Sequence, residues 1–123
     1  MKLFIANYSE HKMTKLMEYL SKIEELEIVG HTSSALDAIQ AIRELQPDVV
    51  ILYVGLMGLV MGSGVGVLIY IRYSNLPVNV IMIADDNCRQ YETWCLEEKA
   101  DHFFSGSEIN QIELLFQDWR QKK

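Results

Sequence analysis

The sequence contains few cysteines, few prolines and no excess of basic residues. Its 123 residues include two cysteines and two prolines, and 11 Lys and Arg stand against 17 Asp and Glu. Nucleic-acid phosphates are bound by clustered Lys and Arg, so a net charge of −6 argues against a nucleic-acid partner. Cys88 and Cys95 lie seven positions apart in a predicted helix, too far along its axis to form a disulfide. Free thiols are typical of the reducing cytoplasm, where we expect this protein.

The composition is that of a globular protein. Half of the residues are hydrophobic and 23% are charged, which excludes a disordered chain. A chain of 123 residues can bury a core without disulfides or metals. We therefore expect a single domain that spans residues 1–123.

One long uncharged stretch needs an explanation. Between Asp48 and Arg72 the sequence reads VVILYVGLMGLVMGSGVGVLIYI, twenty-three residues without a charge. About 20 apolar residues can cross a bilayer, so a membrane span is one interpretation. The alternatives are a buried strand, a loop and a buried helix, or an active-site segment that has lost its active site.

The rest of the chain alternates apolar strands with amphipathic helices. Strands are predicted at residues 2–6, 26–32, 48–54, 78–84 and 101–105. Helices are predicted after Ser9, after a cap at Ser33 or Ser34, and from Asp85 and Ser107 onward. Strands that are apolar on both faces indicate a parallel sheet covered on both sides. A membrane helix would remove the third strand and break this sheet. Five of the seven glycines also lie in the stretch and suit a tight loop, so we predict a strand to Val54, a loop at 55–62 and a helix at 63–73. No membrane contact is expected.

Several phrases, in this order and spacing, resemble the receiver domains of two-component response regulators. They are ALDAIQAIRELQPDVVIL, GSGVGVLIYIR, LPVNVIMIAD and CLEEKADHFFSGSE, and the resemblance extends from Met1 to about Phe116. It implies an α/β, flavodoxin-like (βα)5 three-layer sandwich with a five-stranded parallel sheet of order 2-1-3-4-5.

The resemblance also implies where a phosphorylation site would lie. In receivers an acidic pair after the first strand and an aspartate ending the third strand hold Mg²⁺, and this aspartate accepts a phosphoryl group from a histidine kinase. A hydroxyl residue ending the fourth strand, a lysine ending the fifth and an aromatic switch residue then respond to the phosphate. In this chain the corresponding residues are Asn7 and Tyr8 for the acidic pair, Tyr53 for the acceptor, Ala84 for the hydroxyl, Gly106 for the lysine and Phe103 for the aromatic residue.

Only Phe103 keeps its expected character, so the sequence predicts a degenerate receiver, or pseudo-receiver. Mg²⁺ prefers anionic oxygen ligands, and a neutral amide with two phenols offers it little. Without a carboxylate acceptor, a metal or a lysine, the charge of a transferring phosphoryl group would not be stabilised. We therefore expect no enzyme activity, no metal and no cofactor, and a module that signals through protein contacts.

Two features suggest how such contacts form. The loop after Tyr53 carries the apolar residues Leu56, Met57, Leu59, Val60 and Met61, which either cover the vacated pocket or contact a partner protein. By resemblance, receivers pair through the fourth and fifth helices, so a homodimer is expected there. Receivers usually have a glycine at the end of the fourth helix. Lys99 stands at this position here, and a residue with a side chain is less favourable at such a helix end.

Two other functions remain open. A phosphorylation-dependent receiver would need a relocated acceptor, for which Asp85 is the nearest aspartate, although Asp85 and Asp86 are better interpreted as the N-cap and first-turn charge of the next helix. A flavodoxin-like domain could instead hold a small ligand at Gly62–Gly66, although Val67 stands where a dinucleotide-binding motif needs a further glycine.

Overall fold

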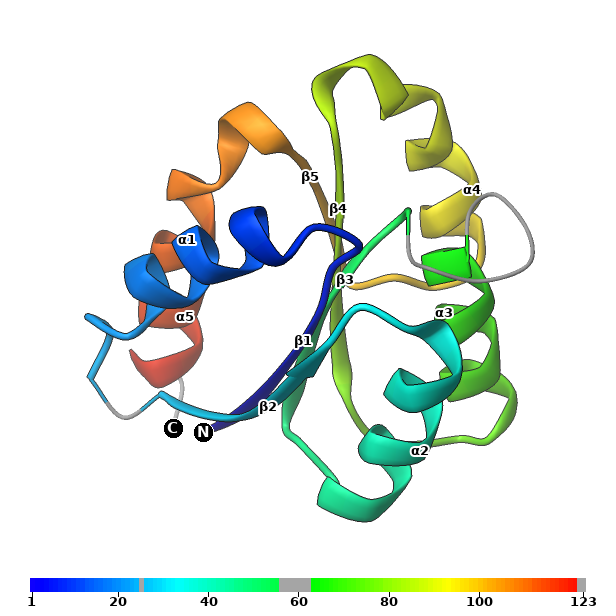
Figure 1. The fold of residues 1–123 in the computed structure, drawn as a ribbon, viewed down its shortest axis with the longest axis horizontal. Coiled ribbons are helices and arrows are strands. Elements are labelled where there is room, and N and C mark those ends of the chain that lie inside the picture. Colours follow the sequence, from blue (N-terminus) through cyan, green and yellow to red (C-terminus); the bar gives the residue numbers. More distant parts are fainter. Residues whose placement is uncertain (25, 56–62, 122–123) are drawn as a thin grey trace.

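The protein is a three-layer α/β sandwich around a parallel five-stranded sheet. The computed structural model describes residues 1–24, 26–55 and 63–121. The strands lie in the order β2-β1-β3-β4-β5. As Figure 1 shows, α1 and α5 cover one face of the sheet, and α2, α3 and α4 cover the other. The predicted fold class and strand order are confirmed.

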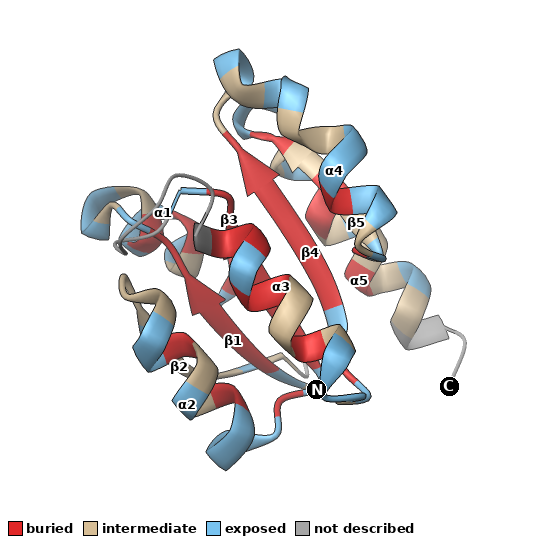
Figure 2. Ribbon diagram, turned by 90° about the vertical axis from the view of Figure 1, so that its right-hand side faces the viewer, coloured by how far each residue is buried: buried red, intermediate tan, exposed pale blue. Residues whose placement is uncertain are grey.

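The strands form where the apolar runs predict them. Their bounds are β1 (Lys2–Ala6), β2 (Glu27–Thr32), β3 (Val49–Tyr53), β4 (Asn79–Ala84) and β5 (His102–Ser105). Every residue of β3 is buried, and β1 and β4 are buried except at their first residue, as Figure 2 shows for these two strands. Strands covered on both faces can carry continuous apolar side chains, which explains the absence of alternation.

The helices lie in the predicted segments, and two of them begin at the expected caps. Their bounds are α1 (Glu10–Leu20), α2 (Ala35–Leu45), α3 (Ser63–Tyr73), α4 (Glu92–Glu97) and α5 (Asn110–Gln121), with 3-10 helices η1 (Asp86–Tyr91) and η2 (Gly106–Glu108). The hydroxyl of Ser9 accepts the N–H of Lys12, and that of Ser34 accepts the N–H of Asp37. Both contacts satisfy N–H groups that a first helical turn leaves free.

The uncharged stretch divides into a strand and a helix, as predicted. β3 ends at Tyr53 and α3 begins at Ser63. The N–H of Gly64 donates to the carbonyl of Val54, and a Cβ at Gly64 would lie only 2.0 Å from the carbonyl oxygen of Tyr53. This glycine therefore lets α3 start directly against the end of β3. None of the described helices has the length and apolarity needed to span a bilayer.

The prediction of one continuous helix after β4 is wrong. The segment is divided into η1 and α4, and Cys88 within η1 has non-helical φ and ψ of −114° and 24°. The break has a tertiary cause, since the carboxylate of Asp86 accepts the N–H of Ser107 and Arg89 contacts Glu108, both beyond β5. Cys88 and Cys95 are both free thiols.

Candidate functional site

The carboxyl ends of the central strands bring the predicted site residues to one edge of the sheet. Ala6 pairs with Leu52, Tyr53 with Ile83, and Ala84 with Ser105, so β1, β3, β4 and β5 end at similar heights. Parallel doubly wound sheets bind their ligands outside this edge. The residues that follow the strands, among them Asn7, Tyr8 and Asp85, are therefore the candidate site.

Two buried residues form the floor of this edge. Tyr53 is 4% exposed, and desolvation raises the pKa of its phenol to about 12, so the hydroxyl stays protonated at neutral pH. Asn7 is fully buried; its Oδ1 accepts the N–H of Ser9, while its Nδ2 has no hydrogen-bond partner within the described residues. The floor thus presents a phenol and an amide, and no carboxylate.

Above this floor, Lys12, Asp85 and Tyr8 form a closed network. The Lys12 ammonium lies 2.6 Å from Oδ1 of Asp85 and donates to the Tyr8 hydroxyl at 3.0 Å. The same hydroxyl donates to Oδ2 of Asp85, also at 3.0 Å, and the ammonium lies 5.3 Å from the centre of the Tyr8 ring. A side chain from α1 is thereby joined to the residue that follows β4.

The network changes the ionisation of both charged members. The hydrogen bond from Lys12 holds the pKa of the Asp85 carboxyl below its usual value, and the hydrogen bond to Asp85 raises the pKa of Lys12. Each charge therefore stabilises the other across the neutral range. Asp85 stands at the predicted N-cap position, directly before η1, but its side chain makes no capping hydrogen bond; Asp86 is the acidic residue of the first turn.

Tyr8 and Tyr53 differ in burial. Tyr53 is buried, whereas Tyr8 is 41% exposed. The Tyr8 ring lies at the rim and contributes its hydroxyl to the ion pair. The cleft is therefore closed by charge pairing as well as by apolar packing.

The residues present do not fit the Mg²⁺ ion that the fold family uses at this edge. Asp85 is the carboxylate of the network, and the Lys12 ammonium already contacts it. Asn7, Tyr8 and Tyr53 are neutral donors of the kind that a hard divalent cation binds poorly. Within the described residues, no three His, Cys, Asp or Glu side chains lie together as metal ligands would.

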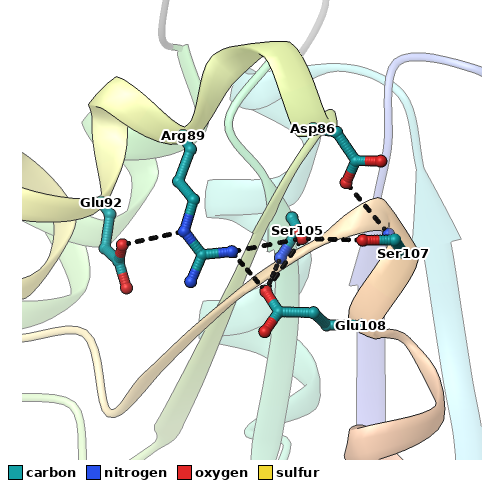
Figure 3. Close-up of polar contacts among 6 residues, drawn as sticks. All are labelled: Asp86, Arg89, Glu92, Ser105, Ser107 and Glu108. Carbon is teal, nitrogen blue, oxygen red and sulfur yellow. Dashed lines mark hydrogen bonds and ion pairs between the residues drawn. The ribbon is translucent and has the colours of Figure 1, made fainter.

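A second polar network joins η1 to β5 and η2 (Figure 3). Arg89 donates to Oε1 of Glu108 at 2.6 Å and contacts Glu92 at 3.2 Å. Glu108 also accepts the N–H of Ser105 at 2.9 Å, and Ser105 is 3% exposed. These contacts lower the pKa of Glu108 to about 2, with the Ser105 N–H as the largest cause. The network attaches the segment after β4 to the end of β5.

The other predicted positions lie in or directly after β4 and β5. Ala84 ends β4 with 3% exposure, and Phe103 is buried within β5. Gly106 begins η2, and a Cβ there would meet no atom within 4 Å. The apolar loop residues Leu56, Met57, Leu59, Val60 and Met61, together with Gly62, lie outside the described residues.

Two basic residues of these networks were not found from the sequence. Lys12 falls between the apolar positions of the α1 pattern, which predicts a solvent-exposed side chain. Arg89 falls in a segment that the sequence predicts to be a regular helix. The one available signal for Lys12 is its place in the first turn after Ser9, at the carboxyl edge of the sheet. Its partner Asp85 is 73 positions away, so no local pattern links them.

The structure is similar to several solved receiver domains. A DNA-binding response regulator of the LuxR family from Staphylococcus aureus matches with a TM-score of 0.85 and 24% identity, over 95% of this chain and 96% of that one. The response-regulator domain of Thermotoga maritima CheB matches with a TM-score of 0.79 and 20% identity, over 98% and 94%. The receiver domain of RcsB from Salmonella enterica serovar Typhimurium, solved with the phosphomimetic BeF₃⁻, matches with a TM-score of 0.83 and 17% identity, over 96% and 88%.

The TM-scores show that the chain shares the receiver-domain fold. Because the identities are all below 25%, the similarity shows the fold alone. No family model matches the sequence, and no curated protein matches it.

Proposed function

We propose that this protein is a pseudo-receiver that acts in two-component signalling through protein contacts, without accepting a phosphoryl group. The observation that carries the proposal is the buried Tyr53 at the end of β3, with the Lys12–Asp85 ion pair beside it. Phosphoryl transfer to a receiver needs a carboxylate at this position and a divalent cation next to it. A phenol with a pKa of about 12 is a poor nucleophile for this step at neutral pH.

The Lys12–Asp85 pair supports the same conclusion from the electrostatic side. A divalent cation at this edge would have to displace an ammonium that lies 2.6 Å from the nearby carboxylate. In the alternative acceptor, Asp85, one carboxylate oxygen accepts a hydrogen bond from Lys12 and the other accepts one from the hydroxyl of Tyr8. A domain closed in this way has no phosphate-dependent population shift and stays in one conformation.

The partner surface is the second part of the proposal. Trp94 and Leu96 on α4 are 40% and 47% exposed, and Leu114 on α5 is 63% exposed. Exposed large apolar side chains favour protein contacts. We assign these helices to the expected homodimer, in the cytoplasm.

The proposal is tested with an amide NMR spectrum of the ¹⁵N-labelled protein before and after addition of Mg²⁺ and beryllofluoride. We expect no saturable shift at Tyr53, Ala84 or Gly106, because the acceptor and the metal ligands are missing. The receiver domain of Salmonella RcsB is the positive control for the reagent, since it has been solved in the presence of this phosphomimetic. Saturable shifts at the three residues would show a working acceptor and overturn the proposal.

The relocated-acceptor alternative is separated by one variant. If Asp85 accepted the phosphomimetic, any shifts seen with the wild-type protein would be abolished in Asp85→Asn. Under the proposal, neither protein shows saturable amide shifts with Mg²⁺ and beryllofluoride. Labelling with acetyl phosphate, followed by intact-mass measurement, gives an independent readout of the same question.

A further inference from the structure

A pocket lies beside the closed site, between α1 and the start of α5. Its volume is about 280 Å³, and it is lined by Lys12, Lys15, Leu16, Tyr19, Tyr53, Asp85, Gly106 and Ile109. The volume is near the lower end of the range for small-ligand pockets, which is about 300 Å³. An α-helix or a strand would not fit in it, whereas one ring system would.

Gly106 lines the pocket and adds no side chain to it. A Cβ at Gly106 would meet no atom within 4 Å, so this position borders empty space. Any larger residue at position 106 could extend into this space. The glycine at the first position of η2 therefore leaves this space unfilled.

The walls of the pocket are mainly apolar and aromatic. Leu16 is buried, and the rings of Tyr19 and Tyr53 come from two different elements. Tyr19 is held in place by α5, because its hydroxyl lies 3.0 Å from Oε2 of Glu113 and 3.3 Å from the carbonyl oxygen of Asn110. Fixed aromatic walls favour a flat, apolar ligand body.

The charges at the rim favour an anion. Lys12 and Asp85 neutralise each other through their ion pair. Lys15 also lines the pocket, and it takes part in none of the ion pairs found among the described residues. Lys15 thus leaves the lining residues with one net positive charge, and the nearby Glu113 carboxylate, which accepts the Tyr19 hydroxyl, does not line the pocket. The protonated Tyr53 phenol adds a hydrogen-bond donor inside.

We propose that this pocket binds a small aromatic carboxylate, with the ring between Tyr19, Leu16 and Tyr53 and the carboxylate facing Lys15. Such a ligand would bind beside the Lys12–Asp85 network and could report a metabolite to a module that no phosphate controls. The inference goes beyond the protein-contact function proposed above and does not depend on it. It also concerns a different part of the chain from Gly62–Gly66.

The test uses 2-naphthoate as the probe and its neutral analogue 2-naphthamide as the matched control. Titration of the labelled wild-type protein is followed by amide NMR. We expect saturable shifts at Leu16, Gly106 and Ile109, with a Kd of about 1 mM or lower, as is usual for a ligand of this size. 2-Naphthamide should bind more weakly, because it offers Lys15 no charge.

Two variants separate the pocket from other binding. Gly106→Leu fills the empty space and should abolish the shifts, while Lys15→Gln should weaken the binding of 2-naphthoate about threefold, as expected for one exposed charge. Lys22→Gln removes an exposed lysine that does not line the pocket and should change nothing. Each variant is checked for its fold by its amide spectrum.

The proposal is overturned by any of three results. These are the absence of saturable shifts, equal affinity for 2-naphthoate and 2-naphthamide, or unchanged binding in a folded Gly106→Leu. None of these results bears on the response to beryllofluoride, so this proposal and the pseudo-receiver proposal fail independently.

Discussion

The ammonium of Lys12 lies 2.6 Å from Oδ1 of Asp85 and joins the first turn of α1 to the end of β4. The contact spans the carboxyl edge of the sheet, where this fold places its ligands. It holds a positive charge of the chain itself beside the one carboxylate of the closed site. An internal ion pair of this kind leaves the site neutral without a bound ion.

Replacement of Lys12 by methionine should release Asp85. Lys12→Met removes the hydrogen bond that contributes most to the lowered pKa of Asp85, so this pKa should rise toward its usual value of 3.8. The pair is partly exposed, with side chains 43% and 38% accessible, so the loss in stability should be at most about 1 kcal/mol. A carboxyl-detected NMR titration measures the pKa, and urea unfolding measures the stability.

The sign of the pH dependence follows from the lowered pKa. A depressed folded-state pKa stabilises the protein above the unfolded value and loses this effect as the pH falls through the folded value. The advantage of the wild type over Lys12→Met should therefore be complete at pH 6 and decline below about pH 4. Lys15→Met, one turn later on α1, is the control and should leave the pKa of Asp85 nearly unchanged.

Glu108 should make the acid stability of the protein depend on the second network. The contacts with Ser105 and Arg89 lower its pKa to about 2, so its stabilising effect is present above the unfolded-state value of about 4.3 and lost as the pH falls through about 2. Glu108→Gln should lower the urea midpoint at pH 6, and the difference from wild type should vanish near pH 2. Glu97→Gln removes the same charge from an exposed position of α4 and should show no such pH-dependent difference.

The strands and most helices could be predicted from the sequence because local patterns determine them. The apolar run at residues 2–6 coincides with β1, and Ser34 caps α2 as its position indicates. The segment after β4 could not be predicted in this way, because Asp86 and Arg89 are held by residues 21 and 19 positions further along the chain. Tertiary contacts of this kind override a helical pattern.

The site could be predicted only in part, for the same reason. The apolar strands place Tyr53, Asn7 and Ala84 at one edge, since parallel strands end together. Which side chains pair across that edge depends on the three-dimensional position of α1. The sequence pattern around Lys12 predicts only that this residue lies on the exposed surface of a helix. The exposure of Tyr8 likewise follows from its hydrogen bonds to Lys12 and Asp85, which no sequence pattern indicates.

Two glycines of α3 should respond in opposite ways to the same substitution. A Cβ at Gly64 would lie 2.0 Å from the backbone oxygen of Tyr53, and backbone cannot move aside cheaply, so Gly64→Ala should destabilise the protein by about 2–3 kcal/mol or more. A Cβ at Gly66 meets no atom within 4 Å, so Gly66→Ala should stabilise the helix by about 1 kcal/mol. Urea unfolding of both variants measures the difference, and a similar effect of the two would show that α3 does not start against β3.

The proposed homodimer leads us to expect a specific effect of the exposed residues of α4. Trp94→Gln and Leu96→Gln remove large apolar side chains that are 40% and 47% exposed, so each should raise the dimer dissociation constant about tenfold or more, as for interface anchors. Leu36→Gln, 79% exposed on α2 and outside the helices assigned to the interface, is the control and should have no effect. Sedimentation velocity over a concentration series gives the constants; a monomeric wild type at millimolar concentration would contradict the assignment.

Replacement of Lys99 by glycine should stabilise the protein. Lys99 follows α4 with a φ of 69°, in the left-handed region that costs a residue with a Cβ about 1 kcal/mol. Lys99→Gly removes this cost and should raise the free energy of unfolding by up to about 1 kcal/mol, less the entropy that glycine adds to the unfolded chain. The carbonyl of residue 99 still accepts the Nε–H of Arg72, so this contact is kept in the variant. Lys99→Ala removes the same long side chain but keeps the Cβ, so it should give no gain. If alanine stabilised the protein as much as glycine, the effect would come from the loss of the lysine side chain and the backbone conformation would not be its cause.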